Sequence, residues 1–168
     1  NIMSLRINDI APNFQINTTQ GEIDFHEWIG DDWAILFSHP KDFTPVCTTE
    51  LGTLAQMSND FKSRNCKIIG LSVDSIEDHN KWRSDIEEVS GAKLSYPLIA
   101  DQKLIVAKLY NMLPAKIDGN ASERSAVENL TVRSVFLIGP DKRIKMSLTY
   151  PMSSGRDLQR PLLNAHTT

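Results

Sequence analysis

The chain has 168 residues, of which 40% are hydrophobic and 23% are charged, and its formal net charge is −3 at pH 7. This length fits a single domain over residues 1–168, and no apolar run approaches the roughly 20 residues that cross a bilayer. Acidic and basic residues are interspersed, so the composition gives no reason to expect binding to nucleic acid or to a membrane surface.

The first half of the chain alternates between apolar strands and helices. After a short entry segment, residues 33–38 form an apolar run with the length of a buried strand. A helix is predicted over residues 45–64, a second buried strand over 67–73 and a second helix over 77–89. A strand, a helix and a strand at this spacing predict a βαβ unit with parallel strands.

The second half is predicted to end in a hairpin. Residues 96–100 indicate a short strand and 102–110 a helix, followed by a long polar surface loop over 113–129. Residues 131–138 and 143–150 flank a Gly-Pro-Asp-Lys turn, which predicts two antiparallel strands.

With a last helix from about residue 155, this order predicts an α/β fold. The expected architecture is a mixed central sheet with helices on both faces, and it resembles the thioredoxin-like folds. In open α/β sheets the active site lies at the carboxyl ends of the parallel strands. Cys47 follows the strand that ends near Ser38 and is therefore expected at such an end.

Cys47 also lies near the predicted start of a helix. Thr44 is suited to cap this helix, and Pro45 can occupy the first helical position, where an N–H group is not needed. In the first turn, unpaired backbone N–H groups and the positive end of the helix dipole favour negative charge. The sequence therefore predicts a reactive thiolate at Cys47, the alternative being a buried structural thiol.

The second cysteine and the start of the chain bear on the redox environment. Only Cys47 and Cys66 are present, too few for a disulfide scaffold and too far apart for a Cys-x-x-Cys pair or a zinc knuckle. Residues 1–8 lack the apolar segment of a secretory signal. We therefore expect a cytoplasmic location.

Four motifs, in order along the chain, resemble the one-cysteine subfamily of the peroxiredoxins. They are Pro40-x-x-x-Thr44-x-x-Cys47 within residues 38–51, and the stretches 74–79, 131–134 and 150–156. The resemblance runs from about Leu5 to Asp157. It implies a thiol-dependent peroxidase that reduces hydrogen peroxide and organic hydroperoxides without a metal, haem or flavin cofactor.

The resemblance also implies roles for the matched residues. Cys47 would attack the peroxide and become a sulfenic acid. Arg133 would hold the thiolate and donate to the peroxide, the alternative being a surface ion pair on its strand. Thr44 would hydrogen-bond the peroxide, and Pro40 would shield the thiolate from water.

Three further residues are expected to support this site. Glu50, one turn after Cys47, is expected to orient Arg133 or another basic residue, and a solvated helix face is the alternative. His39 resembles a subfamily histidine near the thiolate, with a hydrogen-bonded loop residue as the alternative. Arg156 resembles a second supporting arginine, with an ordinary surface position as the alternative.

The chain contains no evident partner that would reduce the sulfenic acid. Cys66 opens a predicted buried strand and is expected in the core, and no Val-Cys-Pro motif is present near the C-terminus. We expect an external thiol to reduce Cys47, with glutathione and a helper protein, thioredoxin or another small reductant as candidates. The resemblance also implies a homodimer.

The chain departs from the subfamily in two places. It stops soon after Arg156, where relatives carry a C-terminal extension, so we expect this extension to be missing or diverged; Pro161 also lies within what would be a family helix. Some relatives are credited with a lipase activity that uses a serine, a histidine and an aspartate. His26 and Asp141 match two of these positions, but Asp32 replaces the serine nucleophile, so we do not expect this activity.

Two other functions are compatible with a reactive cysteine. One is a redox-signalling or chaperone-like binding protein in which Cys47 oxidises without turnover. The other is a thiol-disulfide oxidoreductase, which the absence of a Cys-x-x-Cys pair disfavours.

Overall fold

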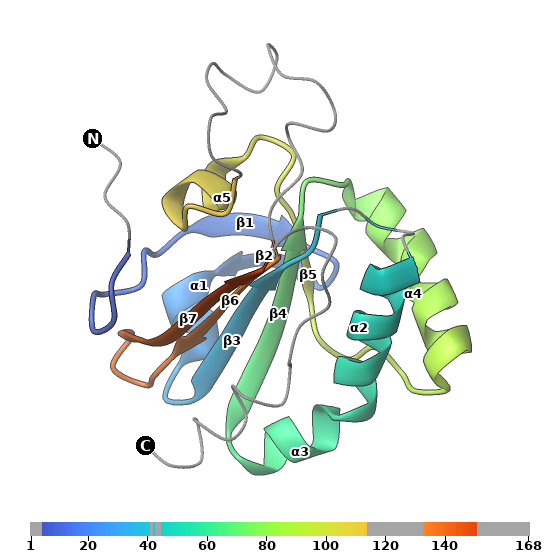
Figure 1. Ribbon diagram of the computed structural model, residues 1–168, viewed down its shortest axis with the longest axis horizontal. Coiled ribbons are helices and arrows are strands. Elements are labelled where there is room, and N and C mark those ends of the chain that lie inside the picture. The colour runs from blue at the N-terminus through green and yellow to red at the C-terminus, as the bar shows by residue number, and fades with distance from the viewer. Residues whose placement is uncertain (1–4, 41, 43–44, 114–132, 151–168) are drawn as a thin grey trace.

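The computed structural model describes residues 5–40, 42, 45–113 and 133–150. Its helices are α1 (Phe25–Ile29), α2 (Pro45–Gln56), α3 (Ser58–Ser63), α4 (Ile76–Ser90) and α5 (Ile105–Leu109). Its strands are β1 (Gln15–Thr18), β2 (Gly21–Asp24), β3 (Trp33–Ser38), β4 (Cys66–Ser72), β5 (Leu98–Ala100), β6 (Arg133–Ile138) and β7 (Ile144–Tyr150). They form one mixed sheet in the order β2-β1-β5-β4-β3-β6-β7 (Figure 1).

The centre of the sheet is the predicted βαβ unit. Strand β3 runs parallel to β4, and β4 runs parallel to β5. On its other side β3 pairs antiparallel with β6, and β6 pairs antiparallel with β7, which confirms the predicted hairpin. Because Phe37 pairs with Val135, the start of β6 lies beside the end of β3.

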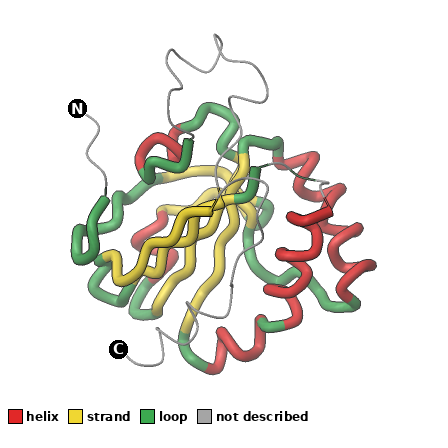
Figure 2. The backbone as a smooth tube through the Cα atoms, viewed as in Figure 1, coloured by secondary structure: helices red, strands yellow, loops and turns green. Residues whose placement is uncertain are grey.

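Helices cover both faces of this sheet, as predicted (Figure 1). Figure 2 shows α2, α3 and α4 together on one side of the strands. Successive strand residues point to opposite faces. Phe37 of β3 therefore joins a core cluster that contains Leu51 of α2 and Trp82 of α4. Leu36 joins a second cluster, which contains Phe25 of α1 and Val106 of α5.

Two predicted helices differ in extent from the observed ones. The single helix expected over residues 45–64 is divided at Met57, where ψ is 2°, into α2 and α3. The helix expected over 102–110 begins only at Ile105, because Leu104 has a positive φ of 60°. The buried Asp101 carboxylate caps α5 by accepting from the backbone N–H groups of Val106 and Ala107.

Strands β1 and β2 and helix α1 were not predicted as elements. The two strands pair antiparallel around a turn in which Gly21 has a φ of 102°, and the Thr18 hydroxyl donates to the Gly21 carbonyl. Much of this hairpin is exposed, so its sequence lacks the apolar run that marks a central strand. This hairpin joins the parallel strands of the sheet through the pairing of Thr18 in β1 with Ile99 in β5.

Several sequence expectations fall outside the described residues. They concern most of the polar loop over 113–129, the helix expected from about residue 155 and the effect of Pro161 on it. Among the helices that the structure does describe, none has the length and apolar character needed to span a bilayer.

Helix α2 is held closely against α4. The Trp82 indole donates to the Thr48 hydroxyl at 2.8 Å, and the Gln56 side-chain amide donates to the Ser90 carbonyl at 2.8 Å. Between these contacts lies Gly52, where an added Cβ would come within 2.9 Å of the Ser90 Cβ. The position of α2, and of Cys47 in its first turn, therefore depends on the absence of a side chain at Gly52.

We predict that Gly52→Ala lowers the free energy of unfolding by about 1–3 kcal/mol through overpacking. In an exposed helix, the same substitution would instead raise the free energy of unfolding by about 1 kcal/mol. Guanidinium unfolding measures the difference. In a Ser90→Gly background the clash is absent and Gly52→Ala is expected to be neutral or stabilising. An equal effect in both backgrounds would contradict the close packing of α2 on α4.

Candidate active site

The sheet register brings Arg133 to Cys47. Cys47 is fully buried in the first turn of α2, just beyond the end of β3. Arg133 is the first residue of β6, and the backbone N–H of its neighbour Ser134 donates to the Ser38 hydroxyl at the end of β3. The Arg133 Nη1 group donates to the Cys47 sulfur at 3.3 Å. A residue 86 positions away in sequence thus lies in contact with the thiol.

Glu50 holds the same guanidinium group. Arg133 Nη1 lies 2.6 Å from Glu50 Oε1, and the exposed fractions of the two side chains are only 4% and 8%. Glu50 follows Cys47 by three residues in α2, so both side chains lie on the same face of the helix. A buried arginine without a counter-ion would be strongly destabilising. The Glu50 carboxylate therefore compensates the charge of Arg133 and orients the guanidinium group toward the Cys47 sulfur.

Of the remaining predicted site residues, the structure describes Pro40 and His39 and does not describe Thr44 and Arg156. Pro40 is buried in the loop between β3 and α2, where it supplies no N–H donor. His39 is fully buried in the same loop. Thr44 and Arg156 lie outside the described residues.

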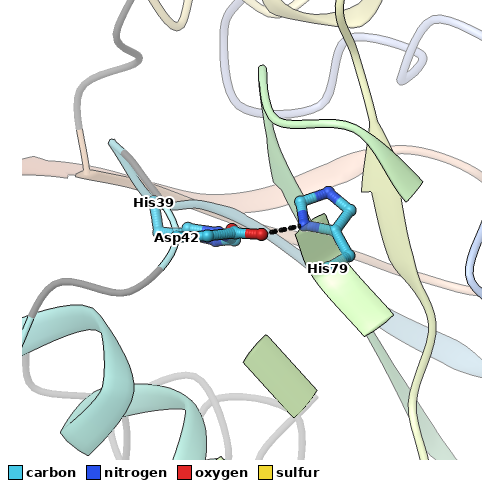
Figure 3. A group of neighbouring side chains, drawn as sticks. All are labelled: His39, Asp42 and His79. Atoms are coloured by element: carbon cyan, nitrogen blue, oxygen red, sulfur yellow. Dashed lines mark hydrogen bonds and ion pairs between the residues drawn. The ribbon is translucent and has the colours of Figure 1, made fainter. Parts of the chain in front are cut away.

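His39 belongs to a buried cluster with Asp42 and His79 (Figure 3). Asp42 Oδ1 lies 2.7 Å from His39 Nε2, and Asp42 Oδ2 lies 2.5 Å from His79 Nδ1. His79 comes from the first turn of α4, so the cluster joins this helix to the loop before Cys47. The contact between Asp42 and His79 was not anticipated, because polar residues in a loop and a helix carry no signal that they share a buried contact.

The cluster shifts the titration of all three groups. Burial acts to raise the pKa of the Asp42 carboxyl, but the hydrogen bonds to His39 and His79 outweigh it and lower this pKa to about 2. Burial lowers the pKa of His39, although Asp42 acts in the opposite direction. For His79, burial also acts to lower the pKa, but the hydrogen bond and the negative charge of Asp42 prevail and raise it.

Cys66 lies away from this site. It is the first residue of β4 and pairs with Trp33, the first residue of β3, whereas Cys47 follows the end of β3. Burial and the negative charge of Asp32 raise the pKa of the Cys66 thiol to about 12. Cys66 and Lys67, at the start of β4, line part of a surface hollow of about 620 Å³. The start of β4 lies away from Cys47. As expected, Cys66 is a core residue.

Chemically, the arrangement suits an anionic sulfur nucleophile. A guanidinium group beside a sulfur can also donate to an oxygen atom bound there. A second possibility is a metal ion at His39, Asp42 and His79, whose donor atoms all lie within 4.8 Å of one another.

Comparison with known proteins places the chain in a family. The model of the AhpC/TSA family matches residues 7–147. The chain is 48% identical over 153 residues to a 1-Cys peroxiredoxin of Dictyostelium discoideum, an alignment that covers 91% of this chain and 60% of that relative. The chain therefore spans less than two thirds of the length of this relative.

Solved structures agree with the fold. A peroxiredoxin 6 variant of Arenicola marina superposes with a TM-score of 0.88 at 40% identity, over 97% of this chain and 73% of that one. A yeast mitochondrial 1-Cys peroxiredoxin gives a TM-score of 0.82 at 45% identity, over 94% and 73% of the two chains. The thioredoxin-like fold expected from the order of elements is thereby confirmed.

We predict that Cys66 is inert in the folded protein. With a pKa of about 12, roughly one Cys66 thiol in 10⁴ is ionised at pH 8. In a Cys47→Ser variant, iodoacetamide at pH 8 should therefore add nothing to the folded protein within minutes and one adduct after unfolding in guanidinium. Intact mass counts the adducts. Rapid labelling of the folded variant would contradict the burial of Cys66.

Proposed function

The chain belongs to the AhpC/TSA family of peroxiredoxins, and on this premise we propose that it is a thiol-dependent peroxidase that reduces hydrogen peroxide and organic hydroperoxides through Cys47. The observation that carries the proposal is the hydrogen bond from Arg133 to the Cys47 sulfur, with the same guanidinium group held by Glu50. This pairing stabilises a thiolate beside a guanidinium group, which can donate to a peroxide.

In the proposed reaction the Cys47 thiolate attacks one oxygen of the peroxide. A sulfur–oxygen bond forms, the oxygen–oxygen bond breaks, and the leaving oxygen takes a proton to become water or an alcohol. Sulfur is oxidised to a sulfenic acid while the peroxide is reduced. Negative charge spreads from sulfur over both oxygens during this step. Each well-placed donor from Arg133 can contribute about 3–4 kcal/mol to stabilising that charge.

Other residues take supporting roles in the proposal. Glu50 is a positioning residue, since it acts through Arg133 rather than on the peroxide. Pro40 shields the sulfur, because a buried proline excludes water without offering a competing donor. From the resemblance alone, we propose that Thr44 hydrogen-bonds the peroxide and that Arg156 supports the site.

The sulfenic acid needs an external reductant in this proposal. Cys66 is unsuited to that role because it lies beside the start of β3, whereas Cys47 lies beyond its end. The yeast relative is described as being resolved through glutathione and thioredoxin systems. We propose that glutathione or thioredoxin reduces Cys47 here.

Assembly, domain extent and location rest on the resemblance and on the sequence alone. We propose a homodimer and one domain over residues 1–168. We also propose a cytoplasmic location, although the yeast relative is mitochondrial.

The test of the proposed function is the rate of the first oxidation. On mixing reduced protein with hydrogen peroxide in a stopped-flow instrument, we expect a fast second-order fluorescence change and one added oxygen by intact mass. Trp82 is the expected reporter, because its indole donates to Thr48 next to Cys47. Cys47→Ser should show no transient. A wild-type rate no faster than that of a free thiol would refute the peroxidase.

Turnover separates an enzyme from a redox sensor. With glutathione or with thioredoxin and its reductase, an enzyme consumes many equivalents of peroxide per Cys47. One fast oxidation without turnover under either reductant would favour the redox-signalling function.

We predict graded effects from the two groups around the sulfur. Arg133→Met should lower the second-order rate constant by about 10²–10³-fold, because a preorganised donor is lost. Glu50→Gln should lower it less, about tenfold, because Gln keeps an acceptor for the arginine but removes the charge that fixes it. The same stopped-flow assay measures both. A Glu50→Gln rate equal to that of the wild type would contradict the positioning role.

A further inference from the structure

The hydrogen bonds of the buried cluster of His39, Asp42 and His79 determine which of its atoms carry protons. His79 Nε2 lies 2.9 Å from the Ile99 carbonyl oxygen in β5. A carbonyl oxygen can only accept a hydrogen bond, so His79 Nε2 carries a proton. The ring is therefore either neutral, with an unprotonated Nδ1, or a doubly protonated imidazolium.

The contact on the other ring nitrogen decides between these two states. His79 Nδ1 lies 2.5 Å from Asp42 Oδ2, a distance that requires a shared proton. The other oxygen of Asp42 faces His39 Nε2 at 2.7 Å, a second contact that needs a donor. A carboxylate satisfies both contacts by accepting twice, which leaves the proton on His79.

The surrounding charges agree with an imidazolium. Negative groups facing His79 come from the loop after β3, as Asp42, and from the segment after β4, as Asp74. The third neighbour, His39, is kept neutral by its burial. The positive end of α4 acts against a cation in its first turn, but Glu77 and Asp78 in the same turn offset it.

A metal ion fits these contacts less well than shared protons do. Zinc bonds of about 2.0–2.2 Å in tetrahedral geometry would hold donor atoms about 3.3 Å apart. The observed separations from Asp42 to the two rings are 2.5 Å and 2.7 Å, which are hydrogen-bond distances.

We propose that His79 is an imidazolium and that its buried ion pair with Asp42 positions the loop between β3 and α2, and through it Pro40 and Cys47, for reaction with peroxide. This inference rests on the proposed function for its kinetic consequence, but the charge on His79 stands independently of any activity. His79 is thus a positioning residue that acts from a different helix.

Hydrogen bonds among the described residues join this loop to its surroundings. The His39 N–H donates to the Leu71 carbonyl of β4, and the Asp42 N–H donates to the Asp74 carboxylate. The Asp42 side chain also accepts from the Ser72 hydroxyl at the end of β4 and reaches α4 through His79. If His79 is neutral, Asp42 becomes a buried carboxylate that has lost its cation, and the loop relaxes. A misplacement of about 1 Å can cost about 10²-fold in rate.

The ion pair has a defined pH window. Because the folded pKa of His79 is raised, its contribution to stability is complete below about 6.5 and is lost as pH rises through the raised value. Because the folded pKa of Asp42 is lowered to about 2, its contribution is complete above its usual value of 3.8 and is lost as pH falls through about 2.

The charge on His79 is measured directly by ¹⁵N NMR of the imidazole nitrogens in the reduced wild-type protein at pH 7. The chain has 4 histidines, and the His79→Gln spectrum assigns the His79 signals. We expect both His79 nitrogens to be protonated. One protonated and one unprotonated nitrogen would overturn the proposal whether or not the protein reduces peroxide.

The kinetic consequence is measured as the second-order rate constant with hydrogen peroxide between pH 6 and 10. The wild-type rate is expected to fall at alkaline pH as His79 loses its proton. His79→Gln should react about tenfold to a hundredfold more slowly at pH 7 and should lack this alkaline fall. Asp42→Asn should move the fall to lower pH, because His79 then lacks its counter-ion.

A matched control is His26→Gln, which removes another partly buried histidine that contacts a backbone carbonyl, that of Ala11. It should keep both the rate and the alkaline fall. A His79→Gln variant with the wild-type rate and profile would overturn the proposal, as would a slower variant that retains the fall. Uptake of one equivalent of Zn²⁺ by the wild type but not by His79→Gln would also overturn it.

If the wild type itself fails to react with peroxide, the proposed function falls, while the NMR result still decides the charge on His79. If the wild type reacts and only the His79 predictions fail, the peroxidase stands and the positioning role is wrong. The two failures are therefore distinguishable.

Discussion

The site depends on one buried contact, in which the Arg133 guanidinium lies between the Glu50 carboxylate and the Cys47 sulfur. A cation enclosed to this degree is tolerated only beside an anion. Glu50 satisfies that requirement in the resting protein, and a thiolate at Cys47 would satisfy it further. The contact exists because β6 pairs antiparallel with β3, so that the start of one strand lies at the end of the other.

Helix α4 holds the chain on both sides of the start of α2. On the helix side, Gly52 allows α2 to approach Ser90 of α4, and Trp82 binds Thr48 beside Cys47. On the loop side, Asp42 connects His39 to His79 of the same α4. Helix α4 therefore contacts the segment before and after the start of α2, which explains how a surface-covering helix can control the position of a thiol that it does not contain.

Prediction from the sequence succeeded where a local pattern carries its own physical meaning. The apolar runs of β3 and β4 have the length and composition of buried parallel strands, and the turn before β7 marks a hairpin, so the sheet core could be predicted. It failed at α5, whose start follows the positive φ of Leu104 and is capped by Asp101, and at β1 and β2, whose exposed residues lack an apolar run. The junction of α2 and α3 at Met57 has no evident cause in the sequence or in the structure.

The sequence by itself indicated Cys47 as the expected nucleophile and the order of the central elements along the chain, because a cysteine placed after a strand and a threonine-proline helix start are local features. Four motifs in order along the chain indicated the family. The approach of Arg133 to Cys47 was expected only through the resemblance, and the tertiary structure placed it there by strand pairing. Neither the sequence patterns nor the resemblance predicted the contact between Asp42 and His79. Their charges depend on being buried together from segments 37 residues apart, and burial and proton sharing arise only when the chain has folded.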